Sequence, residues 1–220
     1  MGGEYAEVFN DPENIASGMY SHAEGAETQA TEVASHAEGG GTQATGTASH
    51  AEGGGTQATG AASHAEGDGT TASGYASHAE GEGTIANAWA SHAEGYSTNA
   101  VGDYSHAEGK GTIANGVAQH VQGKYNVADT TSALIIGNGT STTRSNAYKI
   151  DFSGNSVQTG TISAKGGNMS GHIYFTGAAE NSSTSNTSQI VFGTASNNHV
   201  AISSNKKALV INPDISTTAN

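Results

Sequence analysis

A histidine recurs every 14 residues along the first half of this 220-residue chain. The recurring positions are His22, His36, His50, His64, His78, His92, His106 and His120. Around the first seven the chain reads Ser-His-Ala-Glu-Gly, and a second marker of the form Thr-x-Ala keeps the same register, as in Thr56 and Ala58. A period kept without insertions is typical of an architecture in which each unit stacks on the next.

The period and the composition together exclude helical architectures. Known helical repeats are about 33 residues or longer, and a coiled coil needs apolar a and d positions where this chain has glycine and threonine. Glycine accounts for 32 residues and hydrophobic residues for only 34%, too few for a thick core. Two short strands and two tight turns per repeat fit instead, with glycines at the corners. We therefore expect an all-β parallel solenoid.

Strand geometry sorts the side chains of each repeat, because successive residues point to opposite faces. In the first strand, Ser49, Ala51 and Gly53 share one face, and His50 and Glu52 share the other. In the second strand, the threonine and alanine of the marker share a face, and the residues between and after them point away. The faces that carry only small residues must meet inside, which predicts a thin interior of Ala, Ser and Thr.

The two outward faces differ in how much they vary between repeats. The outward positions of the second strand change from repeat to repeat, as a solvated surface does. Those of the first strand are His and Glu in all seven full repeats, which favours contact with the same face of identical chains around a symmetry axis. The predicted axial ladder consists of His22, Glu24, His36, Glu38, His50, Glu52, His64, Glu66, His78, Glu80, His92, Glu94, His106 and Glu108.

The pattern G-x-x-S-x-A-x-G-x-x-T-x-A-x, read over residues 46–59, resembles the repeat of YadA-type trimeric adhesin heads. The resemblance covers roughly residues 16–128 and implies a left-handed β-roll in a homotrimer. In that family the two variable positions of the strand are usually aliphatic and face the threefold axis. This chain has His and Glu there, so we expect a polar axis.

The ladder allows three chemical interpretations. Pairing one His with each Glu relieves carboxylate repulsion and sets the register of association, which we favour. Rings of imidazoles could instead hold an axial transition ion in one or two layers, with the eight recurring histidines as candidate ligands. A catalytic role is disfavoured, because a site copied seven times without a distinct nucleophile indicates architecture. We assign no catalytic residue and no cofactor.

Charge and composition narrow the partners. The formal net charge is -13, and no Lys or Arg precedes Lys110, so phosphate-mediated binding of nucleic acid is not expected. There is no cysteine, hence no disulfide framework or thiolate metal site. No apolar run approaches the roughly 20 residues of a membrane span, and residues 1–15 lack the features of a signal peptide.

The remainder of the chain also indicates β-structure. Residues 119–123 are an altered repeat, with Gln, Val and Gln replacing Ser, Ala and Glu, and we expect them to cap the solenoid. Residues 133–136 predict a buried strand, and 148–152 and 156–164 a hairpin around Ser153-Gly154-Asn155. The chain divides into an N-terminal segment (1–15), a β-roll (16–128), a β-hairpin neck (129–165) and a small β-sandwich-like domain (166–220).

The text AQHVQGKYN and IIGNGTSTTRSNAYKIDFSGN, within residues 118–155, resembles segments of tail-fibre and appendage proteins of phages infecting Gram-positive bacteria. That resemblance implies a virion protein that attaches to a host. The expected partners are two further copies of the chain, other tail proteins and a bacterial surface glycan or protein receptor, without membrane insertion. A bacterial trimeric surface adhesin and a fibre-associated glycan depolymerase are the alternatives.

Overall fold

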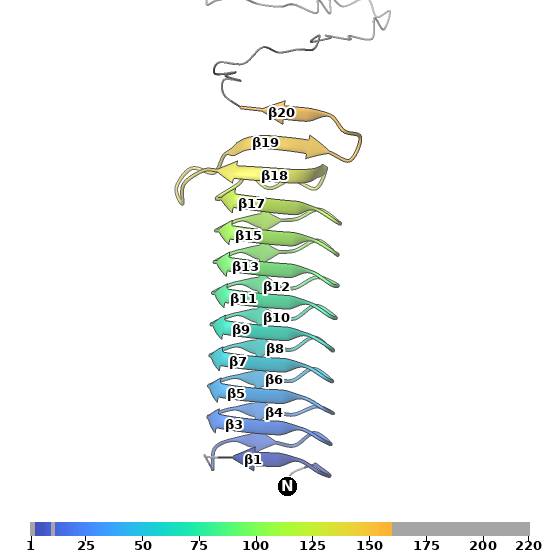
Figure 1. The fold of residues 1–220 in the computed structure, drawn as a ribbon, viewed down its shortest axis with the longest axis vertical. Helices are drawn as coiled ribbons and strands as arrows, with labels where there is room; N and C mark the ends of the chain where they lie inside the picture. Colours follow the sequence, from blue (N-terminus) through green and yellow to red (C-terminus); the bar gives the residue numbers. More distant parts are fainter. Residues whose placement is uncertain (1–2, 10–11, 160–220) are drawn as a thin grey trace, which may run out of the picture. The chain divides into compact units, whose positions relative to one another are not determined.

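The computed structural model describes residues 3–9 and 12–159. All of them lie within one compact unit, Met1–Ser163. The described residues form strands and turns and contain no helix, and hence no membrane-spanning helix. They build a β-solenoid with repeats 14 residues apart (Figure 1), which confirms the predicted all-β solenoid for this part of the chain.

Each repeat contributes one long and one short strand, and the two kinds form separate sheets. The long-strand sheet contains β1 (Glu7–Phe9), β3 (His22–Ala26), β5 (His36–Gly40), β7 (His50–Gly54), β9 (His64–Asp68), β11 (His78–Glu82), β13 (His92–Tyr96), β15 (His106–Lys110), β17 (His120–Lys124), β18 (Ser132–Asn138), β19 (Asn146–Asp151) and β20 (Ser156–Gln158). The short-strand sheet contains β2 (Ile15–Ala16), β4 (Gln29–Ala30), β6 (Gln43–Ala44), β8 (Gln57–Ala58), β10 (Thr71–Ala72), β12 (Ile85–Ala86), β14 (Asn99–Ala100) and β16 (Ile113–Ala114).

Strands of successive turns pair in parallel with identical residues opposite one another. His78 of β11 pairs with His64 on one side and His92 on the other, and Ala79 is matched in the same way. The 14-residue period thus becomes columns of identical side chains that run along the solenoid axis.

The interior is as thin as the pattern predicts. Alanine columns from both sheets, for example Ala51 and Ala58, are fully buried and face each other between the sheets. Columns of buried serine and threonine, such as Ser49 and Thr56, complete the interior. Small side chains are required because the two sheets of each turn are joined by very short corners.

The prediction that Gly53, the glycine at the end of the Ser-His-Ala-Glu-Gly motif, faces the interior is wrong. Gly53 is exposed and has a φ of 104°, and a Cβ placed there would lie 2.1 Å from the carbonyl oxygen of Gly67. Glycine is needed at this position because the next turn approaches closely and because the backbone adopts a conformation that L-residues rarely tolerate.

The parallel long-strand sheet extends beyond both ends of the β-roll predicted for residues 16–128. β1 pairs in parallel with β3, so stacking begins before residue 16. β18 pairs in parallel with β17, so it continues beyond residue 128. The altered repeat therefore does not close the long-strand sheet. Its Gln119 instead connects to the added turn, because the Nε2 group donates to the carbonyls of Asp129 and Ser132.

The predicted hairpin is present, with changed limits. β19 pairs antiparallel with β18 and with β20. In residues 133–136 only Ile135 is fully buried, because the alternating neighbours of Ile135 face outward. β20 covers Ser156–Gln158 of the strand expected over residues 156–164, and residues 160–164 lie outside the described residues. The strands predicted for residues 166–220 lie outside the described residues.

Candidate functional site: the histidine and glutamate ladder

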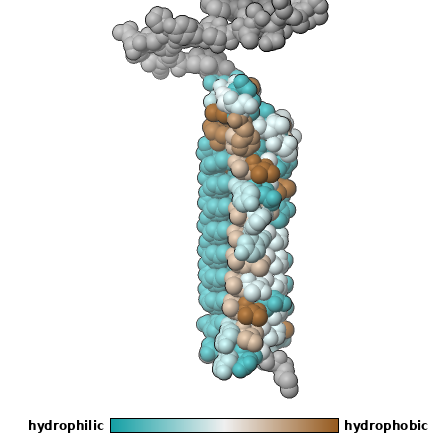
Figure 2. Space-filling view, turned by 90° about the vertical axis from the view of Figure 1, so that its right-hand side faces the viewer, coloured by the Kyte–Doolittle hydropathy of each residue, from teal (hydrophilic) through white to brown (hydrophobic). Residues whose placement is uncertain are grey.

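All fourteen predicted ladder residues lie on the outward face of the long-strand sheet. Parallel pairing brings each His onto the His of the next turn and each Glu onto the next Glu, for example His50 on His64 and Glu52 on Glu66. Figure 2 shows this face from the side as a continuous hydrophilic column along one edge of the solenoid. The single chain therefore gathers the predicted residues into one ladder.

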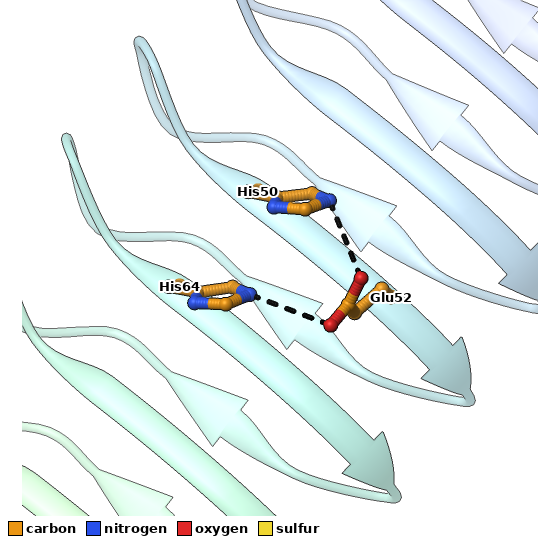
Figure 3. Close-up of side chains that lie close together, drawn as sticks. All are labelled: His50, Glu52 and His64. Atoms are coloured by element: carbon orange, nitrogen blue, oxygen red, sulfur yellow. Dashed lines mark ion pairs between the residues drawn. The ribbon is translucent and has the colours of Figure 1, made fainter.

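The histidine column and the glutamate column run side by side, and the glutamate that each histidine faces changes near the middle of the ladder. In the early turns each His faces the Glu of its own strand, as His36 faces Glu38 at 3.7 Å. In the later turns it faces the Glu of the preceding turn, as His92 faces Glu80 at 3.1 Å. Glu52 lies at the change, with its two oxygens 3.8 Å from His50 Nε2 and 3.9 Å from His64 Nε2 (Figure 3).

The imidazole rings form a continuous stack. From His36 to His106 the ring centroids of successive turns lie 4.6–4.8 Å apart with interplanar angles of 2–9°. This spacing follows directly from the distance between hydrogen-bonded strands. Regular stacking holds each ring edge toward the glutamate column.

Three ladder histidines have a pKa below the ordinary value of histidine. Partial burial lowers the pKa of His36, His64 and His106, and the neighbouring histidines above and below each lower it further; adjacent glutamates offset part of the effect. Partial burial raises the pKa of Glu94, but hydrogen bonds with the neighbouring glutamates and the nearby histidines lower it overall. Burial and the stacked neighbours thus favour the neutral form of these three imidazoles, and the contacts of Glu94 favour its carboxylate form.

Several ladder atoms are shielded from solvent without a hydrogen-bond partner in the described chain. They are the Nε2 atoms of His36, His50, His64 and His106. The nearest carboxylate oxygens to these atoms lie 3.4–3.9 Å away. A buried polar group without a partner is destabilising, so the ladder has hydrogen-bonding capacity that one chain does not use.

Four His-Glu-His groups of the ladder have three ligand atoms within 4.8 Å of one another. Successive stacked rings lie 4.8 Å apart, more than twice a zinc–nitrogen bond of about 2.0–2.1 Å, so two imidazoles held in this stack do not reach one zinc ion. The near-parallel rings also direct their nitrogen lone pairs side by side rather than toward one point. Within one chain, the ladder geometry favours hydrogen bonding over a closed metal shell, and an axial ion stays a prediction.

The columns continue beyond the residues predicted for them. Leu134 pairs with His120 and Ile136 pairs with Gln122, so the His column ends in leucine and the Glu column in isoleucine. Both side chains are half-buried, and hydrophobic residues lie above the hydrophilic column in Figure 2. Adding 14 to the last repeat positions would have found them, but the missing Ser-His-Ala-Glu-Gly signature hid this turn.

A shallow groove runs beside the glutamate column. It is lined by Glu80, Glu94, Glu108 and Gln122 and by the glycines that follow them. The groove exists because glycine leaves no side chain between the glutamates and the edge of the sheet. Its walls are acidic and its floor is backbone.

The fold and the ladder define a class: a parallel β-solenoid repeat protein with one uniform polar face. In comparisons with known proteins, no family model, no curated protein and no solved structure matches this chain.

Proposed function

We propose that the chain is a structural and adhesive segment of a phage tail fibre, and that three copies associate through the ladder face as a left-handed β-roll. The tail-fibre assignment rests on the resemblance of residues 118–155 to phage appendage proteins and of residues 16–128 to trimeric adhesin heads. In this proposal the chain holds and extends a surface that attaches the virion to a bacterial glycan or protein receptor, alongside other tail proteins.

One observation carries the association: the His-Glu face is uniform while the opposite face varies. A solvated ladder would have no reason to keep the same two residues in seven successive turns. Leu134 and Ile136 add an apolar end to the same face. Buried polar groups of this kind specify register more than they stabilise.

The association is tested by the mass in solution, measured by light scattering at pH 7. We expect a mass near three times 21.9 kDa. Leu134→Arg places a charge at the end of the ladder face and should convert the assembly to monomers. Ile85→Arg is the matched control, because Ile85 is 38% exposed on the opposite sheet.

The outcomes separate clearly. A wild-type monomer, or an assembly lost in Ile85→Arg and kept in Leu134→Arg, would refute association through the ladder. Attachment is tested separately, by the binding of fluorescently labelled protein to Gram-positive cells. A trimer that binds no cell surface would leave only the structural half of the proposal.

A further inference from the structure

One corner of the solenoid carries three aromatic side chains, of which the middle one contacts the other two. Tyr75, Trp89 and Tyr104 come from three successive turns, at the corner that precedes each long strand. The ring centroids of Tyr75 and Trp89 lie 5.9 Å apart, as do those of Trp89 and Tyr104. We call these three residues the aromatic strip. It lies apart from the ladder, whose residues follow within the long strands.

The strip is exposed. The three side chains are 57%, 52% and 54% accessible in this chain. Single exposed hydrophobic residues are ordinary on protein surfaces, whereas contiguous exposed patches mark interaction sites. In the turns before the strip, the column of Tyr75 and Trp89 contains Val33, Thr47 and Ala61. The fold therefore does not need an aromatic residue at this corner.

The backbone beneath the strip is fixed by hydrogen bonds between turns. The amide of Ala90 donates to the carbonyl of Tyr75 at 2.8 Å, and that of Tyr104 donates to the carbonyl of Trp89 at 2.8 Å. Asp103 accepts a hydrogen bond from the Trp89 amide through Oδ1 at 3.1 Å. The rings are thus presented at a set spacing along the axis, with an exposed carboxylate among them.

The chemistry of the strip selects a class of ligand. Aromatic faces stack on the C–H surfaces of sugar rings, and a carboxylate accepts hydrogen bonds from sugar hydroxyls. No Lys or Arg occurs before residue 110, so phosphate-rich and other anionic polymers meet only acidic surroundings here. We propose that the aromatic strip binds a neutral glycan chain laid along the solenoid axis. This deepens the adhesive part of the proposed function and rests on it.

The protein provides its own reporter, because Trp89 is the single tryptophan of the chain. The intact protein is titrated with neutral tetrasaccharides of glucose and of N-acetylglucosamine and, as an anionic probe, with poly(glycerol phosphate), while tryptophan emission is recorded. We expect a saturable change with at least one neutral tetrasaccharide and none with the polyanion.

Three variants test the strip without disturbing the fold. Tyr75→Ala and Trp89→Ala introduce the residue that Ala61 already provides in the same column. Tyr104→Ala introduces the residue that Ala90 carries one turn earlier at the same positive φ. Each should weaken binding by about two- to tenfold, the loss of one stacking contact, with Trp89→Ala measured by calorimetry. Tyr96→Ala, at another corner, is the control and should bind as the wild type does.

The other outcomes overturn the inference. A response to poly(glycerol phosphate) alone would assign the strip to anionic polymers. No response with Trp89 accessible to a soluble quencher would mean that the strip binds no glycan. No response with Trp89 protected would mean that a second copy covers it. Light scattering and cell binding on the same samples distinguish these failures from failure of the proposed fibre function, which survives if Trp89→Ala still forms trimers and binds cells.

Discussion

Two glycines of one turn, Gly67 and Gly69, provide a direct test of how the turns stack. Both have positive φ, 107° and 62°. A Cβ at Gly67 would lie 2.1 Å from the carbonyl oxygen of Gly81 in the next turn, whereas a Cβ at Gly69 would meet nothing within 4 Å. Alanine substitutions therefore make the same chemical change in two very different environments.

The expected costs follow from these environments. Gly69→Ala places an L-residue in the left-handed region, a cost of about 1 kcal/mol that reduced freedom of the unfolded chain partly offsets. The chain itself places Ser97 at the equivalent position, with a φ of 51°. Gly67→Ala adds a more strained φ and forces β9 and β11 apart, which weakens the hydrogen bonds between them. We expect a loss of about 3–5 kcal/mol in the free energy of unfolding.

Thermal unfolding followed by circular dichroism measures the difference. For a unit of this size, the expected loss corresponds to a melting temperature lower by roughly 6–20 °C in Gly67→Ala, with a change of a few degrees in Gly69→Ala. Because turns interact mainly with their neighbours, hydrogen exchange should increase most in the turns on either side of residue 67. Equal melting temperatures for the two variants would refute the role assigned to close stacking.

Two further predictions concern an end of the solenoid and acid sensitivity. The Asn126 side chain accepts a hydrogen bond from the Ile113 amide at 2.8 Å and donates one to the Ile113 carbonyl at 3.0 Å. Asn126→Ala removes both bonds, so denaturant titration should show a free energy of unfolding lower by about 2–3 kcal/mol. Asn115→Ala, at an exposed position, is the control, and equal effects of the two substitutions would contradict a capping role for Asn126. Because folding lowers the pKa of His36, His64 and His106 from 6.5, their contribution to stability is complete above pH 6.5 and lost as the pH falls below it. The melting temperature should fall between about pH 7 and 5 with a smaller slope in His64→Gln, and a melting temperature that rises on acidification would contradict this sign.

Repetition explains why so much of the fold could be predicted from the sequence. Seven copies of one strand repeat the same alternation, so the sequence alone predicts that Ser49 and Ala51 face inward and that His50 and Glu52 face outward. The glycine of the repeat was misplaced because alternation alone does not reveal a positive φ or the approach of a neighbouring backbone. The residue before the serine of each repeat, such as Ala62 with a φ of 55°, carries no local sign of its conformation either.

The ends of the solenoid escaped prediction because their residues match the columns in position but not in type. Asn14 and Asn126 occupy the two ends of the buried threonine column, and their longer side chains replace the hydrogen bonds of a missing neighbouring strand. Gln119 does the same for the serine column. The 14-residue register predicts the positions of these residues. Only the strand pairing of the structure shows that their side-chain amides form the hydrogen bonds that a neighbouring backbone forms elsewhere in the column.

The columns also divide the molecule into parts that can vary and parts that cannot. In the turns between the two ends of the solenoid, the thin core restricts the interior columns to Ala, Ser and Thr, and the next turn restricts the glycine column. The corner column accepts residues as different as Thr47, Ala61 and Trp89, because its side chains point to solvent while backbone hydrogen bonds hold its position. A solenoid built in this way can acquire a new binding surface by substitutions 14 residues apart, without altering either its core or its ladder face.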